Sequence, residues 1–142
     1  MATFKTFEDI QAWQKAKEMC TIIGKIIDEG KFQKNFSLID QMERSSGSIM
    51  DNIAEGFERG GNREFLQFLY IAKGSCSEFR SQLYRAKDRS YISVAEFNNL
   101  YGLAKDIISL LQKLINYLET SEMKGLKFKT RQASESTVNV KQ

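Results

Sequence analysis

The stretch NREFLQFLYIAKGSCSEFRSQLYRA, residues 62–86, repeats apolar side chains at alternating steps of four and three residues. Those side chains are Phe65, Leu69, Ala72, Cys76, Phe79, Leu83 and Ala86. Such steps place side chains on one face of an α-helix, which has 3.6 residues per turn. The segment therefore predicts a long helix that buries one face against other elements of the fold.

Three further segments have the same periodicity, two before this stretch and one after it. The faces they predict are Phe7, Ile10, Trp13, Cys20, Ile23 and Ile27; Ile39, Met42, Ser46, Ile49, Ile53 and Phe57; and Phe97, Leu100, Ala104, Ile107, Leu111, Leu114 and Leu118. Glycine readily adopts the left-handed conformation that follows a helix, so Gly60-Gly61 is expected to end the second helix. The expected N-terminal caps are Thr6 with Asp9 for the first helix, Asn62 for the third, and Ser93 with Glu96 for the fourth.

Four helices of about 23–28 residues, joined by short turns, predict an all-α, antiparallel up-down four-helix bundle. The absence of proline from all 142 residues permits long helices, because proline breaks a helix interior. The helical pattern is lost after about Glu122. We therefore expect a bundle over residues 1–121 and a basic, polar C-terminal tail over residues 122–142.

The sequence contains no histidine, which excludes Ser-His-Asp and Cys-His nucleophilic sites and histidine-containing zinc sites. Cys20 and Cys76 lie far apart, and we interpret them as small buried hydrophobic residues of a reducing compartment. No run approaches the roughly 20 apolar residues of a membrane span. These observations predict a cytoplasmic protein that has no enzymatic activity, no cofactor, no metal and no membrane partner.

Two polar stripes run beside the apolar faces of the second and third helices. They are Ser45, Ser48, Asn52, Glu55 and Arg59, and Ser75, Glu78, Gln82, Arg85 and Arg89. They form either solvated faces or a polar network, within the bundle or between subunits. Gly47 and Gly74 lie inside predicted helices and suggest close contact, which would leave Glu55 and Glu78 partly buried. A catalytic or Mg²⁺-binding role for these two carboxylates is a minor alternative.

The net charge of +3 is unevenly distributed. Residues 61–90 hold 6 basic and 3 acidic side chains, and residues 122–142 hold 5 and 2. Basic residues interleaved with aromatic ones suit nucleic-acid backbones and unstacked bases, although a moderately basic surface without a partner is the alternative. The candidate nucleic-acid-binding residues are Lys73, Arg80, Tyr84, Arg85, Lys87, Arg89, Lys124, Lys127, Lys129 and Arg131.

Several segments resemble a family of small bacterial proteins encoded in intervening sequences of large-subunit ribosomal RNA genes. The segment SIMDNIAEGFER at residues 48–59 is similar to the family signature, and FLQFLYIAKGS at residues 65–75 extends the similarity. DIQAWQKA at residues 9–16 also fits. The resemblance covers about residues 7–120. It departs at Met50, where the family often has proline, so we expect a locally straighter second helix.

The resemblance implies a four-helix bundle that assembles as a homopentamer without catalytic activity. It also implies similarity in fold to the accessory variability proteins of diversity-generating retroelements, which bind nucleic acid and a reverse transcriptase. Two functional hypotheses follow. The first is an oligomeric module that binds structured RNA through the third helix and the tail. The second is an accessory scaffold that binds a reverse transcriptase and its RNA.

Overall fold

The computed structural model describes the backbone of residues 4–141 and the side chains of residues 4–121. One short 3-10 turn precedes four α-helices: η1 Phe7–Asp9, α1 Gln11–Asp28, α2 Phe36–Glu58, α3 Asn62–Asp88 and α4 Val94–Lys141. Within residues 4–141 the regular structure is entirely helical. The predicted all-α class is confirmed.

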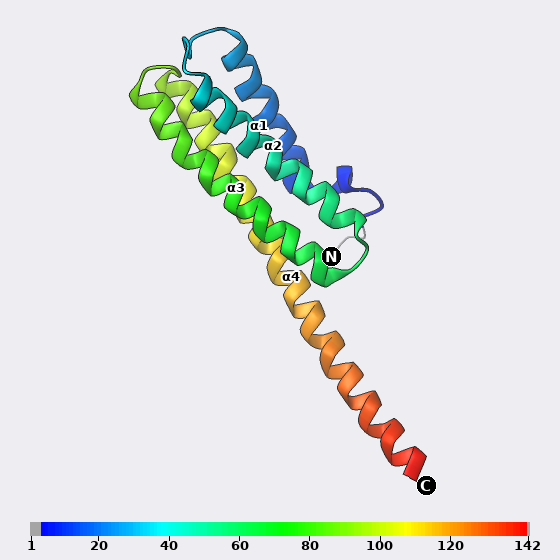
Figure 1. Ribbon diagram of the computed structural model, residues 1–142. Helices are drawn as coiled ribbons and strands as arrows, with labels where there is room; N and C mark the ends of the chain where they lie inside the picture. Colours follow the sequence, from blue (N-terminus) through cyan, green and yellow to red (C-terminus); the bar gives the residue numbers. More distant parts are fainter. Residues whose placement is uncertain (1–3, 142) are drawn as a thin grey trace.

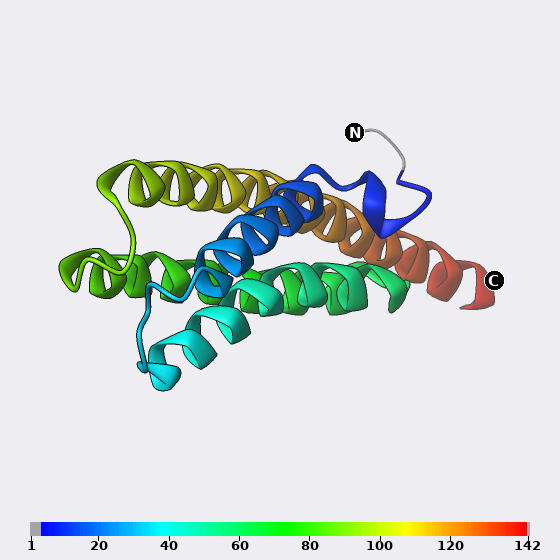
Figure 2. The same cartoon turned by 90° about the horizontal axis from the view of Figure 1, so that it is seen from above.

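Short turns reverse the chain after each of the first three helices, which gives the predicted antiparallel up-down bundle (Figure 1). Around the bundle, α1 packs on α2, α2 on α3, α3 on α4, and α4 on α1. Seen from above, α1 lies between α2 and α4 (Figure 2). This order leaves α3 with α2 on one side and α4 on the other, and those two contacts organise the candidate site.

The core follows the predicted faces most closely in α3 and α4. Every side chain predicted for those two faces is buried, and Phe79 on α3 is among the largest fully buried side chains. In α2 the predicted residues Met42, Ile49 and Ile53 are fully buried, whereas Ile39 and Phe57 are half-buried at the edges of the face. α2 continues without interruption through Met50.

The prediction for the first helix was wrong in its start and in the rotation of its buried face. The helix begins at Gln11, because Ile10 is extended and the Asp9 carboxylate accepts hydrogen bonds from the backbone N–H groups of Lys5 and Thr6. The predicted Thr6–Asp9 capping box is therefore formed, but it caps the short turn η1 and not an α-helix. The buried face is Ala12, Ala16, Met19, Ile23 and Ile26, while Trp13, Cys20 and Ile27 are half-buried beside it.

The other predicted helix ends are confirmed with one shift. Gly60 has a φ of +85°, the left-handed conformation expected after α2. The capping box before α4 is formed, because Ser93 Oγ accepts from the N–H of Glu96, and Glu96 Oε1 accepts from the N–H of Ser93. Asn62 is the first residue of α3 and not its cap, which is Gly61.

Close approach of two helices occurs at Gly56, whereas Gly47 and Gly74 make no close contact within the chain. A contact between subunits at these two glycines stays a prediction. A Cβ atom at Gly56 would lie 2.5 Å from Phe68 Cβ and 3.1 Å from Phe65 Cδ1. A Cβ atom at Gly47 or Gly74 would meet nothing within 4 Å. The absence of a side chain at position 56 therefore allows α2 to lie against α3 where the two helices meet.

The fourth helix is longer than expected. It continues as helix through most of the segment assigned to the tail and ends at Lys141, beyond the ends of the other three helices (Figure 1). The tail residues Lys124, Lys127, Lys129 and Arg131 lie outside the residues whose side chains are described.

Candidate nucleic-acid interface

The two polar stripes face each other across the contact between α2 and α3. Ser45 Oγ donates to Gln82 Oε1 at 2.6 Å, and both side chains are only 4% exposed. Ser48 Oγ and Ser75 Oγ lie 2.9 Å apart and share a hydrogen bond. Asn52 Nδ2 then donates to Ser48 Oγ at 2.8 Å. Ser45 and Gln82 are buried and Ser48, Asn52 and Ser75 are half-buried, so these residues form a polar network between α2 and α3 of one chain. A role of the network in a subunit contact stays a prediction.

The acidic members of the stripes lie at the outer edge of this network. Glu78 is exposed and accepts a 3.2 Å hydrogen bond from Gln82 Nε2. Glu55 is exposed and pairs with Arg59 one turn later, at 2.9 Å. Within one chain the expected partial burial of Glu55 and Glu78 is not found, because both are exposed at the edge of the α2–α3 contact. Their burial between subunits stays a prediction. Among the residues with described side chains, no three metal-ligating groups cluster.

The basic residues of α3 divide between the two sides of that helix. Arg85 lies on the α2 side, where its Nη1 donates to Gln41 Oε1 at 2.9 Å. Arg89 is the residue that caps the C-terminal end of α3, and hydrogen bonds from Asn35 and Arg89 lower the pKa of Tyr91. Neither arginine shares a surface with the other four candidates on α3.

Lys73, Arg80, Tyr84 and Lys87 lie together on the α4 side of α3. We call them, with Phe97, Tyr101 and Lys105 of α4, the α3–α4 strip. Lys73 Nζ donates to Gln112 Oε1 at 2.6 Å. Arg80 Nη2 donates to the Tyr101 hydroxyl at 2.7 Å. Each of these cations is thus held by a neutral group, which positions the charge without cancelling it.

Three aromatic rings, those of Tyr84, Phe97 and Tyr101, form one part of the strip. The rings of Phe97 and Tyr101 stack at 5.3 Å, and the edge of Tyr84 meets both. Arg80 lies over the Tyr101 ring at 4.9 Å, and Lys87 Nζ lies over the Phe97 ring at 4.5 Å. Such cation–π contacts fix the cations over the rings. The cluster therefore presents aromatic surface and positive charge side by side.

The phenols of this cluster have shifted pKa values. The hydrogen bond from Arg80 lowers the pKa of Tyr101, because the guanidinium stabilises the phenolate form. A hydrogen bond with Tyr101 raises the pKa of Tyr84. The guanidinium of Arg80 therefore acts mainly on Tyr101, the phenol that it contacts directly.

Lys105 belongs to the strip but was not among the sequence candidates. It is exposed on α4, and its charge also lowers the pKa of Tyr101, although less than Arg80 does. The sequence held a usable signal, because Lys105 follows Tyr101 by four residues and so shares its helix face. What the sequence alone lacks is the information that this face of α4 packs beside Lys73 and Arg80.

The cysteines agree in part with their interpretation. Cys76 is fully buried, its Sγ donates to the carbonyl oxygen of Ala104, and burial raises its pKa to about 12. Cys20 is half-buried, and burial raises its pKa as well. Since the thiolate is the reactive form, both thiols are poor nucleophiles.

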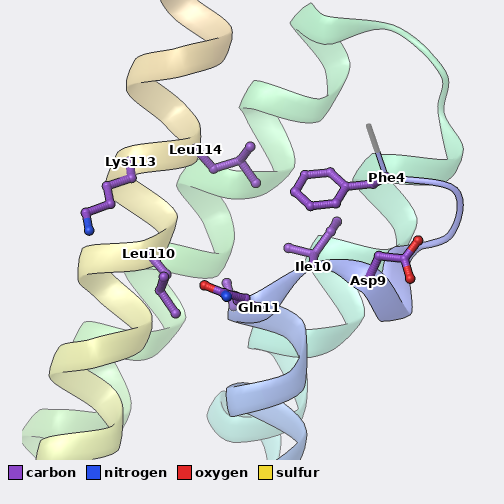
Figure 3. Close-up of a pocket in the computed structure, with 8 residues that line it drawn as sticks. Phe4, Asp9, Ile10, Gln11, Leu110, Lys113 and Leu114 are labelled. Atoms are coloured by element: carbon purple, nitrogen blue, oxygen red, sulfur yellow. The ribbon is translucent and has the colours of Figure 1, made fainter. Parts of the chain in front are cut away.

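A pocket of about 360 Å³ lies away from the strip, between the N-terminal segment and α4. Phe4 and Leu114 extend into it from opposite sides above Ile10 (Figure 3). Its walls are mainly apolar, and the sequence analysis did not anticipate it. No helix in the described part of the chain combines the length and the apolar character that crossing a membrane requires.

Comparison with known proteins identifies the family to which the chain belongs. Residues 8–113 match the model of the 23S rRNA-intervening sequence protein family. A similar solved structure is that of a protein of unknown function from the S23 ribosomal protein family of Bacteroides thetaiotaomicron VPI-5482. It is 25% identical in sequence, with a TM-score of 0.67, and the match covers 73% of this chain and 97% of that one. No curated protein matches the chain. Because the family match spans most of its length, the protein belongs to the 23S rRNA-intervening sequence protein family.

Proposed function

We propose that the protein is a non-enzymatic, homo-oligomeric module that binds structured RNA through the α3–α4 strip. The observation that carries the proposal is the set of three cations, Lys73, Arg80 and Lys87, on one side of α3. Lys87 follows Lys73 by 14 positions along the helix, which is a rise of about 21 Å. Phosphate contacts by lysine and arginine supply most of the sequence-independent affinity for nucleic acids.

The neutral partners of these cations support the proposal. Lys73 contacts an amide oxygen, and Arg80 and Lys87 lie over aromatic rings. A cation that is paired with a carboxylate would have to break that pair before it could bind a phosphate. The three strip cations are positioned by contacts that leave their charge available to phosphate groups.

The oligomer is the second part of the proposal and comes from the family resemblance. In a homopentamer the strip would be repeated five times around the ring, so one folded RNA could contact several copies. Light scattering is expected to give a mass about five times the 16.3 kDa of one chain. A stable 16.3 kDa monomer would contradict this part and leave RNA binding by a single strip to be tested separately.

The proposal is tested by titrating fluorescein-labelled RNA with the purified protein at several salt concentrations. We expect binding at low salt and a linear decline of the logarithm of the affinity with the logarithm of the salt concentration. Three phosphate contacts in one strip give a slope of about −2 or steeper. Failure to bind a stem-loop RNA at low salt would contradict the proposal, and so would an affinity that salt leaves unchanged.

The absence of enzymatic activity is likewise part of the proposal, and Mg²⁺-dependent nuclease and nucleotide-hydrolysis assays test it. The reverse-transcriptase scaffold stays a prediction of the resemblance. Co-purification of the protein with such an enzyme would support it.

A further inference from the structure

We propose that Tyr84 is a stacking platform for an unpaired RNA base, so that the strip prefers single-stranded segments of RNA to duplex. The inference rests on the proposed function and specifies the part of the RNA that the strip contacts. Three observations support it: the ring of Tyr84 is exposed, the rings of Phe97 and Tyr101 hold it in place, and the cations Arg80 and Lys87 lie beside it.

The ring of Tyr84 is both exposed and fixed. It is 46% exposed, yet it meets the Phe97 ring at 5.0 Å and the Tyr101 ring at 5.8 Å, both edge-on. Phe97 is only 6% exposed and anchors the cluster in the core. An aromatic side chain that is already held in place loses little conformational entropy when a ligand stacks on it.

Positive charge lies on both sides of this ring along α3. Arg80 precedes Tyr84 by four residues and Lys87 follows it by three, so all three share one helix face. A base stacked on Tyr84 would bring its flanking phosphates near these two cations. Stacking and phosphate contact together are the usual means by which proteins bind single-stranded nucleic acid without strict sequence preference.

The other exposed tyrosines of the described residues have different surroundings. Tyr70 donates a hydrogen bond to Glu119, and a carboxylate beside the ring would repel phosphate. Tyr117 is 43% exposed but lies sixteen residues after Tyr101 on α4, nearly on the opposite side of that helix. Tyr117 is therefore a matched control of equal type and exposure.

A paired base offers no such surface, because its faces are covered by its neighbours in the stack. Proteins that recognise RNA bases mostly use unstacked nucleotides of loops, bulges and ends, and they stack them on aromatic side chains. The convex surface of a helix cannot enter the deep, narrow major groove of an RNA duplex. The strip is therefore expected to contact a duplex through phosphates alone, with lower affinity.

The test compares Tyr84→Leu, Tyr84→Phe and Tyr117→Leu with the unaltered protein. The probes are a short oligouridine that carries one 2-aminopurine, whose fluorescence is quenched by stacking, and a blunt RNA duplex of the same length. Tyr84→Leu is expected to weaken oligouridine binding roughly 5- to 100-fold, the effect of losing one stacked base, and to abolish the quenching. Tyr84→Phe and Tyr117→Leu are expected to bind within about twofold of the unaltered protein.

The outcomes separate this inference from the proposed function. If the unaltered protein binds neither probe at low salt, the proposed function fails. If it binds RNA but Tyr84→Leu retains full affinity and quenching, the platform is wrong while the proposed function stands. Preference of the unaltered protein for the duplex would also overturn the platform. Circular dichroism of each variant checks that the helices remain folded.

Discussion

Replacing Lys73, Arg80 and Lys87 together by methionine is expected to weaken RNA binding roughly 10²- to 10³-fold at low salt. Each cation that is lost removes about one phosphate contact. The slope of the logarithm of the affinity against the logarithm of the salt concentration should therefore become shallower by about 2. Methionine keeps an apolar chain of similar length, so the packing of the aliphatic stems on α4 is largely preserved. Fluorescence anisotropy with a labelled stem-loop RNA measures the affinity of this variant and its salt slope.

The matched control replaces Lys17, Lys25 and Lys34 by methionine in the same way. These three lysines are exposed and lie outside the strip. This control removes the same net charge of three. Equal losses in the two triple variants would mean that RNA responds to overall charge and not to the strip, which would contradict the assignment. Thermal unfolding of both variants separates loss of binding from loss of the fold.

Gly56→Val is expected to lower the free energy of unfolding by about 3 kcal/mol. The first added carbon would lie 2.5 Å from Phe68 Cβ, which is fixed to the backbone of α3 and cannot rotate away. The two helices must therefore separate, and the side chains buried between them lose packing. Urea unfolding followed by circular dichroism gives the value.

The same substitution at Gly47 and at Gly74 is the control for this prediction. Both sites have open space around an added Cβ atom, so their stability is expected to change by less than about 0.5 kcal/mol. If Gly74→Val lowers the free energy of unfolding of the isolated chain as much as Gly56→Val does, the packing described for α2 and α3 is contradicted. If it lowers stability only in the oligomer, Gly74 lies at a subunit contact.

Periodicity predicted the fold well where the apolar residues alone decide it. Every residue predicted for the faces of α3 and α4 is buried because the helical spacing there is unbroken, although the buried residues Gln82, Leu103 and Ile115 were not assigned to these faces. In α1 the predicted buried face is rotated relative to the observed one. The pattern favours the large residue Trp13, whereas the small residues Ala12 and Ala16 are the ones that lie in the core. The start of α1 depends on the backbone at Ile10, which periodicity does not reveal.

The candidate site was predicted only in part, because its geometry depends on which helices are neighbours. The two serine-containing stripes were recognised, but their pairing across α2 and α3 needs the antiparallel register that brings Ser45 to Gln82. Close approach at Gly56 depends on Phe68 of another helix. Helical spacing already places Lys73, Arg80 and Lys87 on one face and Arg85 on an adjacent one, but it does not show that the first face meets α4 and the second meets α2.

The central claim is that RNA lies on the α3–α4 strip, and photo-crosslinking tests it most directly. The protein is irradiated at low salt with a stem-loop RNA that carries 4-thiouridine in its loop, and the crosslinked peptides are identified by mass spectrometry. We predict crosslinks at Tyr84 and at its neighbours on α3 and α4. Crosslinks confined to the outer faces of α1 and α2, or none at all, would contradict the claim.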